Sequence, residues 1–171
     1  MKRISTAALA VSGMLAALVT VTTMSTRIPV LATEGYIHLG DALILLSAML
    51  VGPLAIPIGG IGSALADLFA GYGPYVLPTL CIKALVGFVA SRGMRLTGRR
   101  ALIRCAVAFA VAELLMVLGY FVVETVMISF AAALVAVPMN LVQAFASVAV
   151  GCALLPVAKR LAPRLRGSRP L

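Results

Sequence analysis

The stretch GYIHLGDALILLSAMLVGP, residues 35–53, places a polar cluster directly before an uninterrupted apolar run. Such a run is typical of a helix in lipid, and the composition of the whole chain agrees with it. Of the 171 residues, 63% are hydrophobic and only 11% are charged, whereas a soluble domain has about 25% charged residues. The sequence therefore predicts an all-α integral membrane protein.

Apolar blocks on both sides of this stretch predict a bundle of six transmembrane helices. Each spanning helix needs roughly 20 residues, so six of them use about 120 and leave short connections. We expect one membrane domain over residues 1–171, ending in a basic cytoplasmic tail over 158–171. The expected helices cover approximately 4–24, 42–51, 54–70, 74–90, 103–123 and 138–157.

The second and third of these helices are expected to form a short bent pair, over about 42–70. Gly52 and Pro53 divide the pair, and Pro57 lies inside its second member. Proline and glycine are tolerated at membrane depth where neighbouring helices satisfy the freed backbone groups. The apolar segment 125–137 is expected either to lie partly at the membrane interface or to extend a neighbouring helix.

Positive charge predicts the orientation of the bundle. Of the 14 basic residues, all except Arg27 and Lys83 fall on one side if there are six spans. Short cytoplasmic loops are enriched in Lys and Arg, so both termini are expected in the cytoplasm and the first segment is expected to remain as an uncleaved helix. Topology thus explains the net charge of +9 better than nucleic-acid binding does.

Three charged residues are candidates for chemistry, two at mid-membrane and Asp41 near the outer end of its helix. Lys83 and Glu113 fall near the middle of their helices, where an isolated charge is costly. We expect them either to neutralise each other or to bind a ligand. Asp41 either accepts backbone N–H bonds at the start of the helix after it, where the helix dipole favours a carboxylate, or contacts a ligand.

Four polar residues are candidates to line a cavity. Tyr36 and His38 stand two apart, and residues two apart in an extended segment point the same way. For His38 both a ligand contact and ordinary loop hydrogen bonding stay open. Asn140 and Gln143 share one face of the last helix and either bond across helices or face the cavity.

Several other functions are not supported, because their sequence motifs are incomplete or missing. GGIGSALAD, residues 59–67, lacks the Gly-Lys-Ser/Thr ending of a phosphate loop, so close helix packing is the better interpretation. One histidine and three isolated cysteines support neither a metal site nor a disulfide framework. No hydrolase motif is present, so we expect neither an enzyme nor a cofactor.

Small residues recur every four positions on the first helix, at Ala8, Ser12 and Ala16. This pattern lets helix backbones approach closely in lipid. The stripe either packs inside the bundle or contacts another subunit.

Five stretches together resemble the substrate-binding S component of energy-coupling factor (ECF) transporters. The likeness is greatest to the riboflavin-type group, which also includes S components for pyrimidine and pyridine vitamins. One departure is His38, where asparagine often stands in the family. The stretches are GYIHLGDALILLSAMLVGP (35–53), GGIGSALADLFAGY (59–72), the lysine of TLCIKALVGF (79–88), GYFVVE (119–124) and PMNLVQA (138–144).

The resemblance implies a vitamin-capturing subunit in a bacterial or archaeal plasma membrane, with its site near the outer face. It also implies a transmembrane coupling subunit and two cytoplasmic ATPases as partners, with Ala8, Ser12 and Ala16 contacting the coupling subunit. The vitamin itself is not specified. The implied pocket residues are Tyr36, His38, Asp41, Lys83, Glu124, Asn140 and Gln143.

Two other functions compete with this one. A self-contained ion-coupled transporter or channel usually has internal repeats and coupling acids near the midplane, and only Glu113 fits that description. The chain could also be a membrane enzyme or an assembly factor. An enzyme needs reactive groups clustered on one side, which the sequence lacks. Dependence of uptake on an ATPase discriminates among the three.

Overall fold

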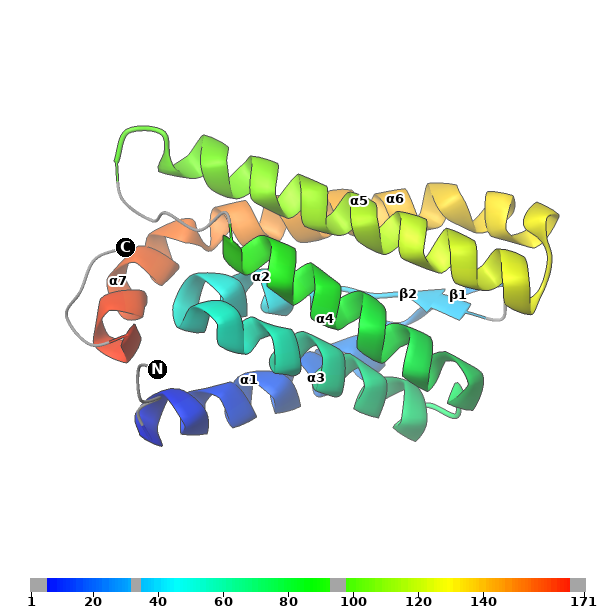
Figure 1. Cartoon of the computed structure of the whole chain (residues 1–171), viewed down its shortest axis with the longest axis horizontal. Helices are drawn as coiled ribbons and strands as arrows, with labels where there is room; N and C mark the ends of the chain where they lie inside the picture. Colours follow the sequence, from blue (N-terminus) through cyan, green and yellow to red (C-terminus); the bar gives the residue numbers. More distant parts are fainter. Residues whose placement is uncertain (1–5, 32–34, 93–97, 167–171) are drawn as a thin grey trace.

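The computed structural model of the chain describes residues 6–31, 35–92 and 98–166. Within these ranges it contains seven α-helices, two 3-10 helices and one β-hairpin (Figure 1). Residues 4–5 of the first expected helix and residues 167–171 of the expected tail lie outside the described residues. The elements are α1 (Thr6–Ser25), β1 (Ile28–Val30), β2 (Gly35–Ile37), α2 (Gly40–Val51), η1 (Gly52–Leu54), α3 (Ala55–Phe69), η2 (Gly73–Tyr75), α4 (Val76–Arg92), α5 (Ala101–Met127), α6 (Phe130–Ala153) and α7 (Leu155–Arg166).

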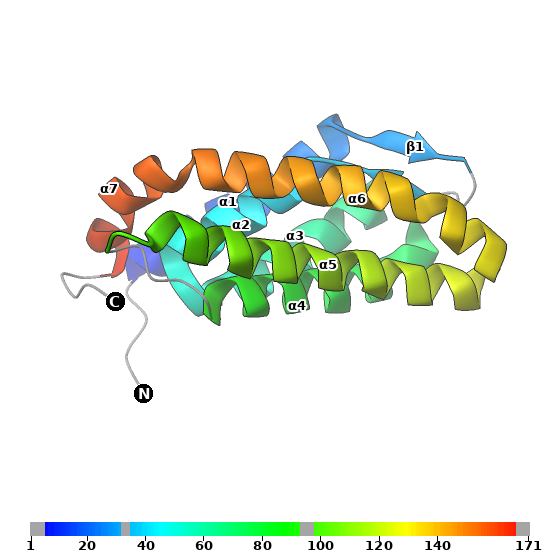
Figure 2. The same cartoon turned by 90° about the horizontal axis from the view of Figure 1, so that it is seen from above.

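The long helices lie side by side along one axis, and the hairpin sits at one end of the bundle (Figures 1 and 2). By length and composition, five helical stretches could cross a membrane. The all-α membrane class is therefore confirmed. Those stretches are Thr6–Ser25, Gly40–Phe69, Gly73–Arg92, Ala101–Met127 and Phe130–Ala153.

The stretch Gly40–Phe69 folds back on itself at η1, so that α2 and α3 run in opposite directions (Figure 1). Gly52, the first residue of η1, takes a left-handed φ of 61°, which glycine adopts without steric cost, and Pro53 follows it. With 12 and 15 residues, the two helices are about 18 and 22 Å long at 1.5 Å per residue. Both are shorter than the roughly 30 Å hydrocarbon core.

Glycines let α3 pack closely against its neighbours. A Cβ on Gly59 would lie 2.7 Å from the carbonyl oxygen of Lys83, and one on Gly62 would lie 2.8 Å from that of Ala16. The Thr20 hydroxyl also donates to the Gly62 carbonyl at 2.8 Å. Close packing of this kind is typical of helices in lipid. The packing interpretation of GGIGSALAD is confirmed.

The last expected helix begins and ends earlier than predicted, and the helix before it ends later. Ser129 caps α6 by accepting a hydrogen bond from the Ala132 N–H at 3.2 Å, so α6 starts at Phe130 and Pro138 lies inside it. Residues 125–137 thus extend α5 and α6, as one of the two alternatives predicted. The helix expected to run to 157 ends at Ala153, and α7 follows with Pro156 in its first turn, where a missing N–H costs nothing.

A buried ion pair joins the centre of the bundle. Lys83 Nζ on α4 donates to Asp41 Oδ2 on α2 at 2.7 Å, and both side chains are 0% exposed. Gln143 Nε2 on α6 donates to the same oxygen at 2.7 Å. Three helices therefore meet at one carboxylate.

This ion pair corrects two expectations. Lys83 forms its salt bridge with Asp41 instead of Glu113, because α2 packs against both α4 and α6. Glu113 is 1% exposed and lies beside the pair, within electrostatic reach of both charges. Asp41 does not cap α2 either, since that helix begins without a side-chain cap.

The ion pair predicts a large loss of stability on removing one charge. Lys83→Met should lower the free energy of unfolding by about 3–5 kcal/mol, because it leaves the buried Asp41 carboxylate uncompensated. Thermal unfolding in detergent measures this change. Lys159→Met, the same substitution at an exposed position of α7, should stay within about 0.5 kcal/mol of the parent. Equal stability of both variants would contradict the role of the ion pair.

Candidate functional site

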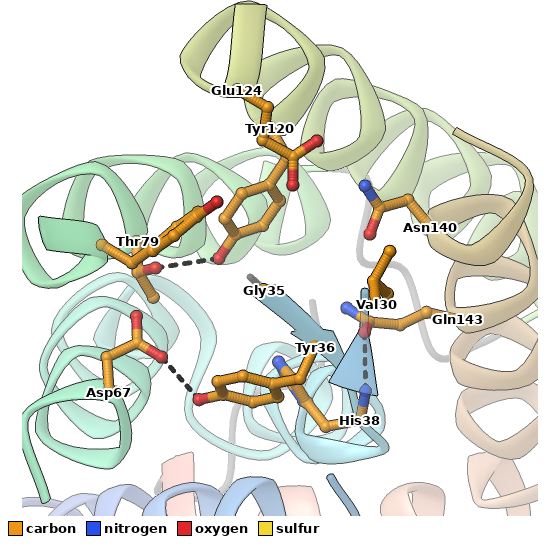
Figure 3. A pocket seen from close by; sticks show the side chains of 11 residues that line it. Val30, Gly35, Tyr36, His38, Asp67, Thr79, Tyr120, Glu124, Asn140 and Gln143 are labelled. Atoms are coloured by element: carbon orange, nitrogen blue, oxygen red, sulfur yellow. Dashed lines mark hydrogen bonds between the residues drawn. The ribbon is translucent and has the colours of Figure 1, made fainter. Parts of the chain in front are cut away.

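A polar pocket lies at the hairpin end of the bundle (Figure 3). It is bounded by β2, by the end of α3, by the start of α4 and by the facing sides of α5 and α6. The volume open to the centre of a water molecule is about 30 Å³, which is room for a few waters. Its lining residues are Val30, Gly35, Tyr36, His38, Asp67, Tyr75, Thr79, Tyr120, Glu124, Asn140 and Gln143.

The hairpin and the residue that follows it bring three of these side chains to the pocket, those of Val30, Tyr36 and His38. β1 and β2 pair antiparallel, with Ile28 opposite Ile37 and Val30 opposite Gly35. Val30 and Ile37 are buried with Ala136 of α6, which fixes the hairpin on the bundle. Because side chains alternate along a strand, the residues on either side of Ile37 face the pocket instead.

His38 is held by its backbone and by one ring nitrogen. Its N–H donates to Gln143 Oε1 at 2.7 Å, and its Nδ1 accepts the Gly40 N–H at 3.0 Å. Burial and the nearby positive charge of Lys83 lower the pKa of His38 to about 3. The ring is therefore neutral, and since Nδ1 is an acceptor, the proton sits on Nε2.

Tyr36 links the hairpin to the end of α3. Its hydroxyl donates to Asp67 Oδ1 at 2.5 Å (Figure 3), and its ring packs on Tyr72 with centroids 4.7 Å apart. Burial and the adjacent Asp67 raise the pKa of Tyr36 above its usual range. The phenol stays protonated at neutral pH and acts as a donor to the carboxylate.

The wall opposite Tyr36 comes from α4, α5 and α6. Thr79 Oγ1 and Tyr120 Oη form a hydrogen bond of 3.0 Å, and the Tyr120 ring lies 5.2 Å from Lys83 Nζ, which is a cation–π contact. Figure 3 shows Glu124 and Asn140 facing the same space from α5 and α6. The ion pair thus lies beneath the pocket without lining it.

The structure brings together five of the seven residues that the sequence singled out for the pocket. Asp41 and Lys83 lie below it and reach it only through Gln143 and Tyr120. The five that line it are Tyr36, His38, Glu124, Asn140 and Gln143. Sequence reasoning missed Val30, Gly35, Asp67, Tyr75, Thr79 and Tyr120.

The small-residue stripe of α1 lies elsewhere. Ser12 is 7% exposed, and the Ala16 carbonyl packs against Gly62. Ala8 is half-buried. Much of the stripe therefore contributes to packing inside the bundle. Within residues 6–31, 35–92 and 98–166, no three His, Cys, Asp or Glu side chains gather in a way that could hold a metal ion.

Comparison with known proteins identifies the family. The family model of the ECF-type riboflavin transporter S component matches residues 3–161. An uncharacterized protein from Pyrococcus woesei is 39% identical over 152 residues, which cover 86% of this chain and 99% of that protein. The chain is thus a multi-pass membrane protein of the ECF-type riboflavin transporter S component family, whose members capture the substrate of an ECF vitamin-uptake transporter.

Proposed function

We propose that this chain binds a small water-soluble vitamin or vitamin precursor in the pocket under the β1–β2 hairpin, at the outer face of the plasma membrane. A transmembrane coupling subunit and two cytoplasmic ATPases then drive its delivery. The observation that carries this proposal is the pocket itself: convergent polar side chains at one end of an apolar bundle. Ligand sites of this kind combine a few placed polar groups with largely apolar surroundings.

The direction of the helices supports six spans with both termini in the cytoplasm. α2 and α3 run in opposite directions and each is short, so together they count as two tilted passes. The beginning of α1 and the whole of α7 then lie at the same end of the bundle, opposite the hairpin (Figure 1). That end carries the described basic residues Arg92, Arg99, Arg100, Arg104, Lys159, Arg160, Arg164 and Arg166, while Lys2, Arg3, Arg95 and Arg169 lie outside the described residues.

Entry of a vitamin requires the hairpin to move. The open volume of about 30 Å³ is too small for an aromatic vitamin, whose sites are of the order of 300 Å³ or more. Two hydrogen bonds hold the pocket face of the hairpin to the bundle: Tyr36 to Asp67 and the His38 N–H to Gln143. We infer that these bonds exchange with ligand contacts as the hairpin opens and closes.

The pocket residues take distinct roles in this proposal. His38 Nε2 and the Asn140 amide contact the ligand, while Tyr36, Glu124 and Gln143 shape the polar wall. Asp41 and Lys83 act from beneath by holding Gln143. Ala8, Ser12 and Ala16 are proposed to let the coupling subunit approach α1, mainly along the edge near Ala8, since Ser12 is buried.

Orientation can be tested by cysteine labelling in intact cells. In a variant with Cys81, Cys105 and Cys152 replaced by alanine, Leu31→Cys on the 95% exposed hairpin tip should react with a membrane-impermeant maleimide. Arg160→Cys on α7 should react only after permeabilisation, because it is expected on the cytoplasmic side. The reverse pattern would rule out capture from the exterior.

Energy coupling can be tested by uptake in cells that lack their own vitamin transporters. Accumulation of radiolabelled vitamin should require the coupling subunit and an active ATPase pair. Replacing the lysine of the ATPase phosphate loop should therefore abolish accumulation. Uptake by this chain alone that collapses when the proton or sodium gradient is dissipated would instead support the ion-coupled transporter.

The pocket assignment predicts weaker binding in two variants. His38→Ala and Asn140→Ala should each reduce ligand affinity tenfold or more, about 1.4 kcal/mol, because each removes a polar group that lines the cavity. Ser91→Ala near the opposite end of α4 is the matched control, since the Ser91 hydroxyl bonds only the Phe88 carbonyl of its own helix. Titration calorimetry measures affinity and thermal unfolding checks the fold. Parent-like affinity in both pocket variants would remove these residues from the site.

A further inference from the structure

The pocket is acidic. Its lining includes the carboxylates of Asp67 and Glu124, whereas none of the eleven lining residues is lysine or arginine. Asp67 is only 4% exposed. A buried carboxylate without a cation beside it is unfavourable, so Asp67 favours a positive charge within the pocket.

One oxygen of Asp67 has no hydrogen bond. Oδ1 accepts the Tyr36 hydroxyl at 2.5 Å, but Oδ2 is buried and has no partner within the described part of the chain. The Thr79 hydroxyl faces Asp67 as a hydrogen-bonding group, but the nearest bond that it forms is the one with Tyr120 at 3.0 Å, in which either hydroxyl can donate. Oδ2 therefore remains as an acceptor in the wall of the pocket.

The nearest cations are committed elsewhere. Lys83 lies beneath the pocket, paired with Asp41 at 2.7 Å. Arg27 stands on the exposed rim, 5.8 Å from the centre of the Tyr36 ring, and donates to the Met24 carbonyl. His38 is uncharged near neutral pH, because its pKa is lowered to about 3. None of the three supplies a positive charge inside the cavity.

Aromatic side chains surround the same space. Tyr36, Tyr75 and Tyr120 all line the pocket. Phenol rings pack well against flat heterocycles and attract a cation placed over their faces. The three tyrosine rings therefore favour a ligand that is both flat and positively charged.

We propose that Asp67 is the specificity-determining residue of the pocket, and that it selects an aromatic heterocycle bearing a positive charge or an amidine-like pair of N–H donors. Asp67 Oδ2 accepts the donor of the ligand, and the ligand supplies the missing charge. Charge-assisted hydrogen bonds are shorter and stronger than neutral ones. Ligands with neither a positive charge nor such a donor edge lose this contribution, and anionic ligands are repelled by Asp67 and Glu124. This inference rests on the proposed capture function.

The test uses the purified full chain in detergent, freed of any co-purified ligand. Calorimetric titration with four probes compares thiamine, which carries a cationic ring, and hydroxymethylpyrimidine, which carries an amidine-like edge, with neutral riboflavin and anionic pyridoxal 5′-phosphate. Thiamine or hydroxymethylpyrimidine, or each of them, should bind more tightly than both riboflavin and pyridoxal 5′-phosphate. Asp67→Asn should weaken that binding about 10- to 100-fold, the range expected for loss of a hydrogen bond to a charged group.

Tyr36→Phe separates the role of the carboxylate from that of its hydrogen bond to Tyr36. It removes the Tyr36–Asp67 hydrogen bond, which the amide oxygen of Asp67→Asn can still accept, and it leaves the carboxylate in place. Because Tyr36 belongs to the pocket wall, every affinity can fall, but the order of preference among the four probes should stay the same. Thermal unfolding verifies that both variants fold. Tightest binding of riboflavin or pyridoxal 5′-phosphate overturns the inference, and so does an Asp67→Asn variant with unchanged preference. If riboflavin binds and is taken up with the ATPases, the capture function stands and only the charge selection fails. If no probe binds and no uptake depends on the ATPases, both fail.

Discussion

The contact between Asp41 and Lys83 is the constraint on which the rest of the molecule depends. Two fully buried charges 2.7 Å apart are tolerated only with good geometry and further hydrogen bonds, and Gln143 supplies one of these. The oxygen of the same Gln143 amide, Oε1, accepts the His38 N–H. Gln143 thus connects the hairpin to the ion pair that lies one layer deeper.

This arrangement separates a rigid base from a movable cover. Below the pocket, glycine-mediated contacts hold α3 against α1 and α4 at backbone distance, and such contacts leave little room for gradual deformation. The cover is a hairpin of two three-residue strands, joined to the bundle by a small apolar cluster and by hydrogen bonds from Tyr36 and His38. Under the proposed function, ligand entry therefore changes few contacts, all at the hairpin end of the bundle.

The sequence predicted what depends on local pattern and missed what depends on pairing between helices. Alternation placed Tyr36 and His38 on one side of an extended segment, and helical spacing placed Asn140 and Gln143 on one face. The partner of Lys83 could not be read in this way, because two acids at membrane depth were available and only the packing of α2 decides between them. Pro138 was mistaken for a helix start because the Ser129 cap is a weak signal in an apolar segment. Asp67 looked like an ordinary acid at a helix end, since its partner Tyr36 lies 31 residues away.

Family membership and pocket chemistry answer different questions about the ligand. A family model that matches residues 3–161 reflects mainly the shared helices, because packing and topology involve most of those positions. The ligand contacts only a few side chains, and relatives can change these without changing the fold. The pocket of this chain combines three tyrosines, a neutral histidine and two carboxylates. Basic residues gather instead at the far end of the bundle, and none of the residues that line the pocket is lysine or arginine. The chemistry of the lining therefore bears on the choice of ligand more directly than family membership does.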